Sequence, residues 1–421
     1  MEKQIKQRTE QINNGQVPEG YKKTEFGIFP SDWVTDKKLK DIGSFDKGRG
    51  LPGDKMCDSG VPCVGYGDIY MKYNNFHFEK AENFVDEETA SESLPIKKGT
   101  LLFTGTGETA EEIGKCVCYN GDETIYAGGD IITFKTNDVN PLFLAYQQYQ
   151  YYSLAKKASF GQGHSVVHIH ADNLEKLNVA YPKSTAEQEK IAVILMKWDK
   201  VIELQEKTIE KLHTKRDAVV QRVIKKKEGW HKEILSNILV ERTEFATKED
   251  GYPHASLTMD GVTQKTDRYN RDFLVKSDDK KYKVTHYNDI CYNPANLKFG
   301  VICVNKYEND AIFSPIYITY EVNPQYNTDF IGSILCSADF IRYIRKYEEG
   351  TVYERQAVKS SDFLRGVIWV PDTKEEQDQI ASIISEINTY IQKQVDYCNS
   401  LKQQRKALQQ YLLNGIVRVE V

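Results

Sequence analysis

The 421-residue chain contains no run that approaches the roughly 18 apolar residues of a membrane-spanning helix. Its first segment, MEKQIKQRTEQINNG, is polar and lacks the apolar core of a signal peptide. The eight cysteines are scattered and none forms a CxxC pair, which argues against a disulfide framework and against a zinc site. These absences predict a cytoplasmic protein without structural metal.

The chain also lacks an excess of positive charge, because it has 56 Lys and Arg against 61 Asp and Glu residues, a formal net charge of −5. Net charge therefore gives no support for nucleic-acid binding, and any basic surface must be local. One local cluster comprises Lys211, Lys215, Arg216, Arg222, Lys225, Lys226 and Lys227. A solvated helix end, where cations suit the helix dipole, is the simpler explanation of this cluster.

Two long stretches repeat the same apolar pattern 189 positions apart. Apolar side chains recur at spacings of three and four from Ile191 to Val223, and the ladder returns from Ile380 to Leu412. Such a heptad seam is typical of helices that pack on one another. Each ladder is interrupted by polar residues at matching steps: Gln205 and Arg216, then Gln394 and Arg405.

Polar residues in a seam cost stability but fix register, so we expect the two helices to pack in one register. The alternative is that some of the four residues face partner subunits instead of the seam. The first seam spans roughly 48 Å at about 1.5 Å per residue.

The segments that precede the two helices match as well, at offsets of 186 to 189. KKGTLLFTGTGETAEEIGKCVCY parallels HYNDICYNPANLKFGVICVNKY, and DNLEKLNVAYP parallels SDFLRGVIWVP. AEQEKIA and EEQDQIA then open the helices. Drifting offsets are normal for duplicated domains that differ in loop length.

The two ends of the chain show a further match at an offset of 400. Ile12, Asn14, Gly15 and Val17 correspond to Leu412, Asn414, Gly415 and Val417. The first segment therefore reads as the tail of a third, truncated helix repeat. This predicts a circular organisation in which the termini meet.

Within each repeat, short β-rich runs alternate with Gly, Asn and Asp turns, which predicts strands of a mixed or antiparallel sheet. The runs are GTLLFTG, CVCY and DIITFK in the first repeat and NDICYN, VICVNK and IYITYEV in the second. We predict one helix after the strands in each repeat, over 141–157 and over 328–347.

This arrangement resembles the DNA-specificity subunits of type I restriction–modification systems, over essentially the whole chain. The resemblance is carried by GYKKTEFGIFPSDW, by GTLLFTGTGE followed by IGK, and by DNL with YP or VP before the EQ-bearing helix starts. It implies an α+β fold in which two target-recognition domains of mixed or antiparallel sheet plus helices are separated by two long antiparallel coiled-coil helices. The implied organisation is circular and pseudo-twofold.

We expect five segments on this basis. They are an N-terminal helical segment (1–17), a first target-recognition domain (18–183), a central long helix for spacing and subunit binding (184–227), a second target-recognition domain (228–372), and a C-terminal long helix with its tail (373–421).

The resemblance also implies what each part does. Each target-recognition domain would read one half of a split, asymmetric sequence in double-stranded DNA, and the helices would set the unread spacer. Two modification subunits, which methylate adenine with S-adenosylmethionine, would bind the helices, and up to two restriction subunits would cleave DNA with ATP and Mg. The chain itself is expected to catalyse no reaction and to bind none of these cofactors.

Two loops at the same repeat position differ in sequence, as two readers with different targets would require. FGQGHSVVHIH and GTVYERQAVK carry hydrogen-bonding groups suited to base edges, such as Arg for guanine and Gln for adenine. The predicted contacts are Gln162, His164, Ser165 and His168 in the first loop and Tyr353, Arg355, Gln356 and Lys359 in the second. No Cys or acidic residue accompanies the histidines at ligand spacing, so no metal is expected. Surface variation without function is the alternative.

Turns supply the other predicted contacts. The basic turn KGRG places Lys47 and Arg49 where they can meet phosphates, and Arg242 sits at the comparable place in the second repeat. The turn YNPAN offers Asn293 and Asn296 to adenine edges. The remaining predicted contacts are Tyr66, Thr104, Thr258 and Lys298. For KGRG a solvated turn, and for YNPAN an Asn-rich turn, is the competing interpretation.

Neither near-motif supports catalysis by this chain. FTGTG looks like a glycine-rich cofactor loop, but no βαβ unit surrounds it. YNPAN is similar to the signature of adenine methyltransferases but lacks the aromatic residue that would stack on a flipped base. The second hypothesis is a symmetric coiled-coil scaffold that presents two β-rich protein-binding modules without binding DNA.

Overall fold

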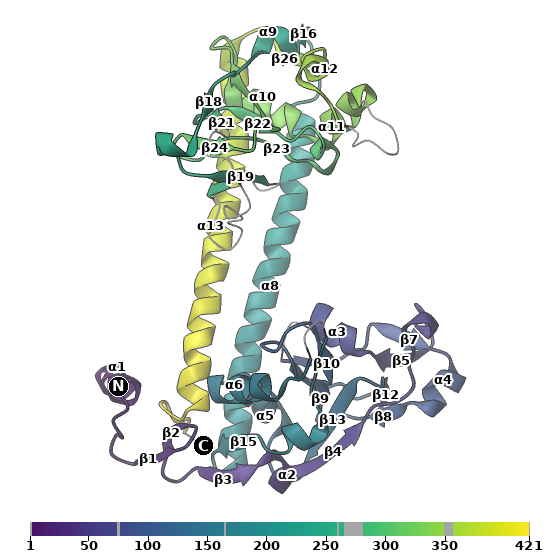
Figure 1. Ribbon diagram of the computed structural model, residues 1–421, viewed down its shortest axis with the longest axis vertical. Coiled ribbons are helices and arrows are strands. Elements are labelled where there is room, and N and C mark those ends of the chain that lie inside the picture. The colour runs from purple at the N-terminus through teal and green to yellow at the C-terminus, as the bar shows by residue number, and fades with distance from the viewer. Residues whose placement is uncertain are drawn as a thin grey trace. The chain divides into compact units, whose positions relative to one another are not determined.

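The computed structural model describes residues 2–73, 76–163, 166–258, 261–264, 281–348 and 357–420. The chain divides into unit 1, with Met1–Glu206 and Tyr397–Val421, and unit 2, with Lys207–Asp396. Each unit therefore contains one part of each long helix, α8 (Thr185–Val223) and α13 (Lys374–Leu413) (Figure 1). No helix in the described ranges is both long enough and apolar enough to cross a bilayer.

Unit 1 is built around two sheets. The larger has the order β4-β13-β9-β11-β6, with β4 at Gly43–Lys47, β13 at Ile131–Thr136, β9 at Thr100–Thr104, β11 at Cys116–Tyr119 and β6 at His77–Phe78. The smaller has the order β7-β5-β12-β8, with β7 at Asn83–Val85, β5 at Val61–Val64, β12 at Ile125–Ala127 and β8 at Leu94–Ile96. β6 runs parallel to β11 and β5 parallel to β12, whereas the other neighbours are antiparallel.

Short strand pairs and helices complete unit 1. The pairs are β1 (Tyr21–Thr24) with β2 (Gly27–Pro30), β3 (Val34–Lys38) with β15 (Asn178–Tyr181), and β10 (Thr106–Gly107) with β14 (Val167–His168). The helices before α8 are α1 (Glu2–Asn13), α2 (Leu39–Ile42), the 3-10 turn η1 (Gly53–Lys55), α3 (Tyr66–Met71), α4 (Glu87–Glu92), α5 (Pro141–Gln147), α6 (Tyr151–Phe160) and α7 (Ala171–Leu174).

Unit 2 also contains two sheets, and all neighbouring strands within them are antiparallel. One sheet has the order β17-β25-β22-β23, with β17 at Leu239–Glu241, β25 at Ile318–Val322, β22 at Ile290–Tyr292 and β23 at Ile302–Val304. A second has the order β18-β21-β24, with β18 at Phe245–Ala246, β21 at Tyr282–Thr285 and β24 at Ala311–Phe313. β16 (Trp230–Ile234) pairs with β26 (Val367–Pro371), and β19 (Ala255–Thr258) pairs with β20 (Gly261–Gln264).

The described helical elements of unit 2 share with unit 1 a short helix at the start and two short helices after the sheets. They are α9 (Leu235–Ile238), η2 (Lys248–Asp250), η5 (Leu297–Phe299), α10 (Thr328–Leu335), α11 (Ala338–Ile344), η6 (Arg345–Tyr347) and α12 (Ser360–Phe363). The predicted α+β class is confirmed, because sheets and helices mix within each unit.

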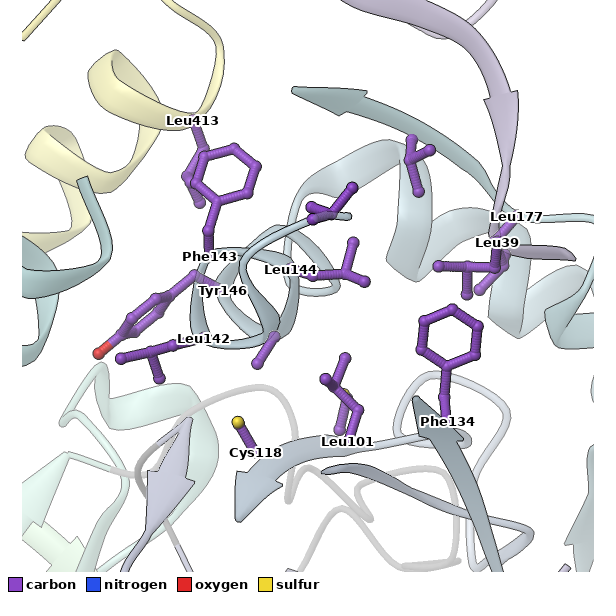
Figure 2. Packing of buried hydrophobic residues seen from close by; sticks show 14 of the residues in the cluster. Leu39, Leu101, Cys118, Phe134, Leu142, Phe143, Leu144, Tyr146, Leu177 and Leu413 are labelled. Atoms are coloured by element: carbon purple, nitrogen blue, oxygen red, sulfur yellow. The ribbon is translucent and has the colours of Figure 1, made fainter. Parts of the chain in front are cut away.

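The central sheet of unit 1 is covered on both faces, which explains why its strands are apolar at consecutive positions. Leu101 and Phe103 of β9 belong to one core, whereas Leu102 belongs to a second core with Val117 of β11. Figure 2 shows Leu101 and Cys118 facing α5 in the first core, with Phe134 beside Leu39 and Leu177. A strand buried on both faces reads as a continuous apolar run rather than an alternation.

The EQ motif at the start of each long helix has a structural role in both units. The Asn140 side chain caps α5 by accepting a hydrogen bond from the Phe143 backbone amide at 3.0 Å. The backbone amide of Asn140 in turn donates to the side-chain oxygen of Gln188 of α8 at 2.7 Å. In unit 2, the Asn327 amide donates to Gln377 of α13 at 2.9 Å in the same way. The glutamine therefore joins the long helix to the residue that caps the short helix. The sequence showed the repeated EQ motif but not this contact.

The single helices predicted over 141–157 and 328–347 are wrong. Each region contains two helices, α5 and α6 in unit 1 and α10 and α11 in unit 2. In unit 2 the second helix has its own cap, because the Ser337 hydroxyl accepts from the Phe340 amide at 3.2 Å. A serine inside an apolar pattern can cap a new helix instead of continuing the old one.

The two ends of the chain meet within unit 1, as the circular organisation predicted. The Tyr21 hydroxyl donates to the Gly415 carbonyl at 2.6 Å, and the Arg8 guanidinium of α1 donates to the Ile416 carbonyl. Gly15 and Gly415 both adopt the left-handed conformation, with φ of 72° and 66°. The chain therefore leaves α1 and α13 through a glycine of the same backbone conformation.

The long helices pack antiparallel in each unit. In unit 1, Asp199 and Glu206 of α8 form ion pairs with Arg405 and Lys402 of α13, at 2.7 Å and 2.6 Å. In unit 2, Val220 and Val223 of α8 pack against the core that contains Ile380 and Ile384 of α13.

The four polar residues of the seam do not behave alike. Arg405 is buried and bonds Asp199 across the seam, as a register residue should. Arg216 instead pairs with its neighbour Asp217 at 2.6 Å. Gln205 and Gln394 are half-buried.

Candidate nucleic-acid interface

Four loops meet at one end of the central sheet of unit 1. The strand register places Lys47 beside Ile132 and Thr104 beside Ile131, so β4 and β9 end where β13 begins. The basic turn 48–50, the turn after β9, and the segment 128–130 before β13 therefore lie together. β10 pairs with β14, which adds the loop around His168 to the same end.

Glycines allow the close approach of these loops. A Cβ on Gly48 would lie 1.9 Å from the Gly128 carbonyl oxygen, so no larger residue fits there. The Gly105 amide donates to the Asp130 carbonyl at 2.7 Å, and the Gly105 carbonyl accepts from the Ile169 amide at 3.0 Å. Gly105 of FTGTG thus serves loop packing, since a Cβ there would lie only 3.1 Å from the Asp130 carbonyl oxygen.

Several predicted contacts are exposed at this end. Lys47, Arg49, Gln162 and His168 all lie on the surface. Gln162 and His168 exchange two backbone hydrogen bonds of 3.1 and 2.9 Å, and His168 Nδ1 lies 3.2 Å from the Thr106 hydroxyl. Backbone pairing therefore holds Gln162 and His168 beside one another, with both side chains open to solvent.

The charge at this end is mixed. Lys47 and Arg49 supply positive charge from the basic turn, while Glu108, Glu111 and Glu112 are exposed in the loop that follows β10. Among the described loops at this end, the exposed positive charge of Lys47 and Arg49 is therefore confined to the side of the basic turn. Tyr66, at the start of α3, is 42% exposed and is available to a ligand.

The structure contradicts the prediction that the Thr104 side chain contacts DNA. Its side chain is 0% exposed, and its hydroxyl lies 2.8 Å from the Tyr70 hydroxyl and accepts from the Lys115 amide at 3.0 Å. Tyr70 also donates to the Thr106 carbonyl at 3.2 Å. Sequence reasoning missed Tyr70 because its partners lie more than 30 residues away, which no local pattern reveals.

The IGK turn that contributed to the family resemblance is held by a buried lysine. Gly114 has a φ of 68°, and its carbonyl accepts from Lys157 Nζ at 2.8 Å. Burial lowers the pKa of Lys157 to about 8, because the charged ammonium is poorly solvated inside the unit. The matching turn in unit 2 has Gly300 at a φ of 82° but Ile344 at the position of the lysine.

Unit 2 presents its own polar residues beside the YNPAN turn. The Tyr292 hydroxyl donates to the Val358 carbonyl at 3.0 Å, and the Val358 amide donates to the Pro294 carbonyl at 3.3 Å. These bonds bring Asn296 and Lys359, both exposed, to one region of the unit. Lys298 is half-buried, with its ammonium 5.2 Å from the centre of the exposed Phe299 ring.

Asn293 and Thr258 are engaged within unit 2. Asn293 is 6% exposed and its side-chain oxygen accepts from the Ala295 amide at 3.1 Å, so the predicted adenine contact is wrong. The Thr258 hydroxyl donates to the Gly261 carbonyl at 3.1 Å across the β19–β20 hairpin. The predictions for His164, Ser165, Tyr353, Arg355 and Gln356 lie outside the described residues.

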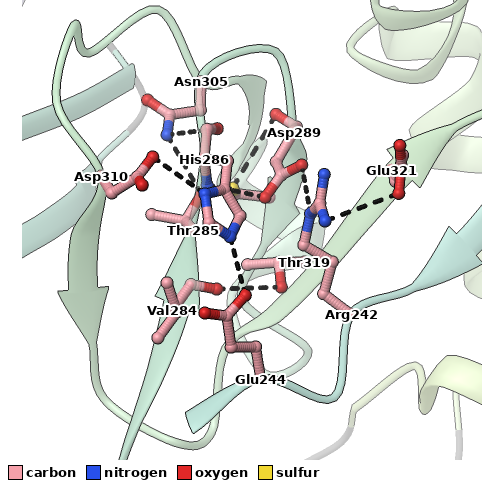
Figure 3. Close-up of polar contacts among 11 residues, drawn as sticks. Arg242, Glu244, Val284, Thr285, His286, Asp289, Asn305, Asp310, Thr319 and Glu321 are labelled. Atoms are coloured by element: carbon pink, nitrogen blue, oxygen red, sulfur yellow. Dashed lines mark hydrogen bonds and ion pairs between the residues drawn. The ribbon is translucent and has the colours of Figure 1, made fainter. Parts of the chain in front are cut away.

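Arg242 corrects another prediction (Figure 3). Its guanidinium Nε lies 2.7 Å from the buried Asp289 carboxylate, and its Nη1 lies 3.5 Å from Glu321. Two carboxylates therefore neutralise the charge of Arg242, which we predicted to contact a DNA phosphate. Arg242 joins β17, β22 and β25 instead.

His286 lies beside this arginine and carries an altered pKa. Its two ring nitrogens are each 2.8 Å from a carboxylate, Nε2 from Glu244 and Nδ1 from Asp310. Burial lowers the pKa of His286, but the hydrogen bonds to the two carboxylates outweigh it and raise the pKa above its ordinary value. Among the residues that the structure describes, no group of three His, Cys, Asp or Glu side chains could hold a metal ion.

The geometry thus defines two α+β domains, each with exposed polar loops gathered at one region. Residues 30–214 match the family described as the type I restriction modification DNA specificity domain. This match confirms, for residues 30–214, the resemblance seen in the sequence.

Curated relatives carry the same description. The chain is 28% identical over 201 residues to the type I restriction enzyme MjaIX specificity subunit of Methanocaldococcus jannaschii, which is 45% of this chain and 43% of that protein. A second relative from the same organism is 28% identical over 243 residues, 55% of this chain and 52% of that protein. The chain therefore spans about half the length of the curated relatives it matches.

Solved structures share the fold over nearly the whole chain. The S subunit of a type I restriction–modification system from M. genitalium has a TM-score of 0.53 at 14% identity, covering 90% of this chain and 96% of that chain. A structure described as the basis of complex assembly and conformational transition of the type I system has a TM-score of 0.57 at 11% identity, covering 96% and 100%.

Proposed function

We propose that the chain is the DNA-recognition subunit of a type I restriction–modification complex, in which each unit reads one half of a split, asymmetric site in double-stranded DNA. The observation that carries this proposal is the pairing of a repeated frame with different exposed loops. The frame includes the cap of the short helix by Asn140 or Asn327 and its bond to Gln188 or Gln377. The exposed loops carry Gln162 and His168 in one unit and Asn296 and Lys359 in the other.

The exposed groups suit base readout better than catalysis. Gln and Asn side chains can pair with adenine edges, and Lys and Arg with guanine or with phosphate. We propose that methylation and ATP-dependent cleavage belong to partner subunits, and that S-adenosylmethionine, ATP and Mg are bound there and not by this chain. The location is proposed to be cytoplasmic, where such a complex meets DNA.

We propose that two modification subunits dock on the long helices, and that up to two restriction subunits join them. Exposed apolar residues outside the seam support this docking. Val201 of α8 is 47% exposed, and Tyr390, 189 residues later on α13, is 53% exposed. Ile383, one heptad before Tyr390, is 46% exposed. Apolar residues at one heptad position on both helices are suited to two like partners.

The experiment is single-molecule sequencing of adenine methylation in DNA exposed to the assembled complex. A split sequence with two unlike halves and a constant spacer is expected. Insertion of one heptad into both long helices should change the spacer and leave both half-sites unchanged. Methylation without a fixed split sequence would refute the proposal.

The second candidate, a scaffold that presents two protein-binding modules, is favoured by the acidic net charge of −5. Salt dependence separates the two candidates. Binding to DNA through phosphates weakens steeply as salt rises, because counterions are released on binding. A complex that shows no DNA binding at low salt would favour the scaffold.

A further inference from the structure

Unit 1 buries a lysine directly before the loop that carries two of the predicted DNA contacts. Lys157 lies in the last turn of α6 and is 1% exposed, and α6 ends at Phe160, shortly before Gln162. Its partners are a backbone carbonyl and a ring, because Nζ donates to the Gly114 carbonyl at 2.8 Å and lies 5.6 Å from the centre of the Tyr149 ring. A buried ammonium that no carboxylate neutralises is costly, and an apolar side chain would fill the same space without that cost.

The matching position of unit 2 shows that the frame folds without this lysine. Ile344 occupies it and is 0% exposed. The turn still forms, since Gly300 has a φ of 82° where Gly114 has 68°. The lysine packs more tightly on its turn, because a Cβ on Gly114 would lie 3.0 Å from Lys157 Cδ, whereas one on Gly300 would lie 4.0 Å from Ile341 Cδ1. The lysine therefore serves unit 1 in particular and not the shared fold.

Hydrogen bonds lead from the Gly114 turn towards the loop. The Thr104 amide donates to the Lys115 carbonyl at 3.0 Å, and the Lys115 amide donates to the Thr104 hydroxyl at 3.0 Å. The Thr104 hydroxyl lies 2.8 Å from the Tyr70 hydroxyl. Lys115 Nζ also donates to the Tyr70 carbonyl at 3.3 Å. The residue that follows Gly114 is thus bonded to both β9 and α3.

The Tyr70 hydroxyl continues this path to the strand pair of the loop. It donates to the Thr106 carbonyl at 3.2 Å, and Thr106 of β10 is the register partner of His168 of β14. The Thr106 hydroxyl lies 3.2 Å from His168 Nδ1, and His168 exchanges two backbone bonds with Gln162. Tyr66, a further exposed candidate contact, starts the helix that carries Tyr70. The path therefore reaches three of the exposed candidate contacts of unit 1.

We propose that Lys157 is a positioning residue for DNA readout by unit 1. Its buried ammonium fixes the Gly114 turn to α6, and the turn in turn fixes the β10–β14 pair that holds Gln162 and His168. The lysine acts through this pair and not by touching DNA, since its side chain is buried. The inference rests on the proposed function, in which each unit reads one half-site. Because Ile344 replaces the lysine in unit 2, the other half-site is an internal reference.

The strength of the contact depends on the charge of the lysine. Burial lowers the pKa of Lys157 to about 8. Cys116 of β11 and Tyr149 are the titratable groups that face it, and burial raises the pKa of both, so neither carries charge at that pH. A hydrogen bond from a charged donor is roughly twice as strong as one from a neutral donor. The hold of Lys157 on the turn therefore weakens as pH rises through about 8.

The same deprotonation has the opposite effect on stability. The folded pKa of Lys157 is lower than the unfolded value of about 10.4, so the unfolded chain binds more protons between the two values. Its contribution to the free energy of unfolding therefore rises with pH over this range, because the cost of the buried charge disappears. A positioning role and a purely structural role thus predict pH effects of opposite sign.

The test compares the native chain with Lys157→Met in the full complex with modification subunits. Single-molecule sequencing of adenine methylation in genomic DNA gives the selectivity of each half-site, which is methylation at matched sites relative to sites with one altered base in that half. We expect Lys157→Met to lower the selectivity of one half-site about tenfold, the scale of one lost base contact, and to leave the other unchanged. Equal loss in both halves, or no loss, would overturn the inference.

The pH profile of the native complex is the second measurement. The selectivity of the half-site that Lys157→Met relaxes should fall relative to that of the other half as pH rises through about 8. In the Lys157→Met complex this relative change should be absent. A ratio of the two selectivities that does not depend on pH in the native complex, or depends on it equally in the variant, contradicts the positioning role.

A second pair of variants keeps the test decisive if Lys157→Met does not fold. Tyr70→Phe removes the hydroxyl that reaches β10. Tyr73→Phe is its matched control in the same unit, because the Tyr73 hydroxyl accepts from the Glu82 amide at 3.2 Å, away from the loop. We expect Tyr70→Phe to lower the selectivity of one half-site and Tyr73→Phe to lower neither. Equal effects of the two variants would count against the proposed path.

The outcomes separate this inference from the proposed function. If the native complex methylates no split sequence, the proposed function fails and the positioning role fails with it. If the native complex methylates a split sequence, and neither Lys157→Met nor Tyr70→Phe relaxes one half of it, the positioning role alone is refuted.

Discussion

The two units use the same frame, but they treat the matching arginine of the helix seam differently. In unit 1, Arg405 is buried between Asp199 and two aromatic rings. In unit 2, Arg216 pairs with Asp217 of its own helix and borders a cavity. A repeated pattern of residues therefore does not imply repeated energetics, because the partners of a polar residue decide whether it stabilises the unit.

A second difference concerns the tryptophan near the start of each unit. In unit 2, Trp230 Nε1 donates to Glu376 at 3.0 Å. In unit 1, the matching Glu187 is paired with Arg418 of the C-terminal tail at 2.6 Å, and Trp33 Nε1 has no partner within the described residues. The tail thus takes the acceptor that the tryptophan uses in the other unit.

Removal of the buried carboxylate should produce the largest effect. Asp199→Asn leaves Arg405 buried without its counter-ion, which is expected to cost unit 1 about 3–5 kcal/mol of unfolding free energy. Asn388→Ala, the matched change in unit 2, should cost less than about 1 kcal/mol. Urea titration followed by hydrogen exchange in each unit measures both values. Equal losses would mean that the two arginines are equivalent after all.

The phenol of the same cluster should have the next largest effect. Tyr146→Phe removes a hydrogen bond to a charged group and is expected to cost about 1.5–3 kcal/mol. The matched Ser333→Ala removes a hydroxyl beside the cavity and should cost about 0.5 kcal/mol. Chemical denaturation of the two variants provides the comparison, and a larger loss for Ser333→Ala would contradict it.

The helix caps should respond alike in the two units. Asn140→Ala and Asn327→Ala each remove a cap of a short helix, with bonds of 3.0 and 2.9 Å, and each should cost about 1 kcal/mol. Thermal unfolding of both variants tests this equality. If only one of the two variants loses stability, the matching caps do not contribute equally to the stability of the two units.

The smallest expected effect is a difference in pH dependence. Burial lowers the pKa of His77 in unit 1, whereas carboxylates raise the pKa of His286 in unit 2 above its ordinary value despite its burial. His77 therefore contributes stability above about pH 6.5 that is lost as pH falls, and His286 contributes stability below about pH 6.5 that is lost as pH rises through its folded pKa. His77→Gln and His286→Gln should each flatten the pH profile of one unit in urea titrations. Identical slopes in both units would refute this assignment.

Much of the fold could be predicted from local patterns. The strand runs TLLFT and ICY are apolar because both of their faces are covered, and the glycines at 15 and 415 mark the same helix end. The break within each predicted short helix could not be predicted, because Ser337 and Gln150 look like ordinary helical residues until a new helix starts beside them.

The candidate site was predicted less well than the fold. Lys47, Arg49, Gln162 and His168 are exposed, whereas Thr104 and Asn293 are buried and hydrogen-bonded within their units. Residue type does not distinguish these cases, since Thr and Asn serve turns and readout equally well. Asp199 could have been found from the repeat. It directly follows the seam residue Trp198 and corresponds to Asn388, which directly follows Ile387.

The sequence by itself determined the duplication, the heptad spacing of the long helices and the meeting of the chain ends, because each is a relation between residue types at fixed intervals. Tertiary structure alone decided which arginine is buried and which one opens onto a cavity. Arg405 and Asp199 are more than 200 residues apart in the chain, and the free energy of their contact depends on what surrounds them. The repeated helix is therefore the same element twice, placed in two different environments.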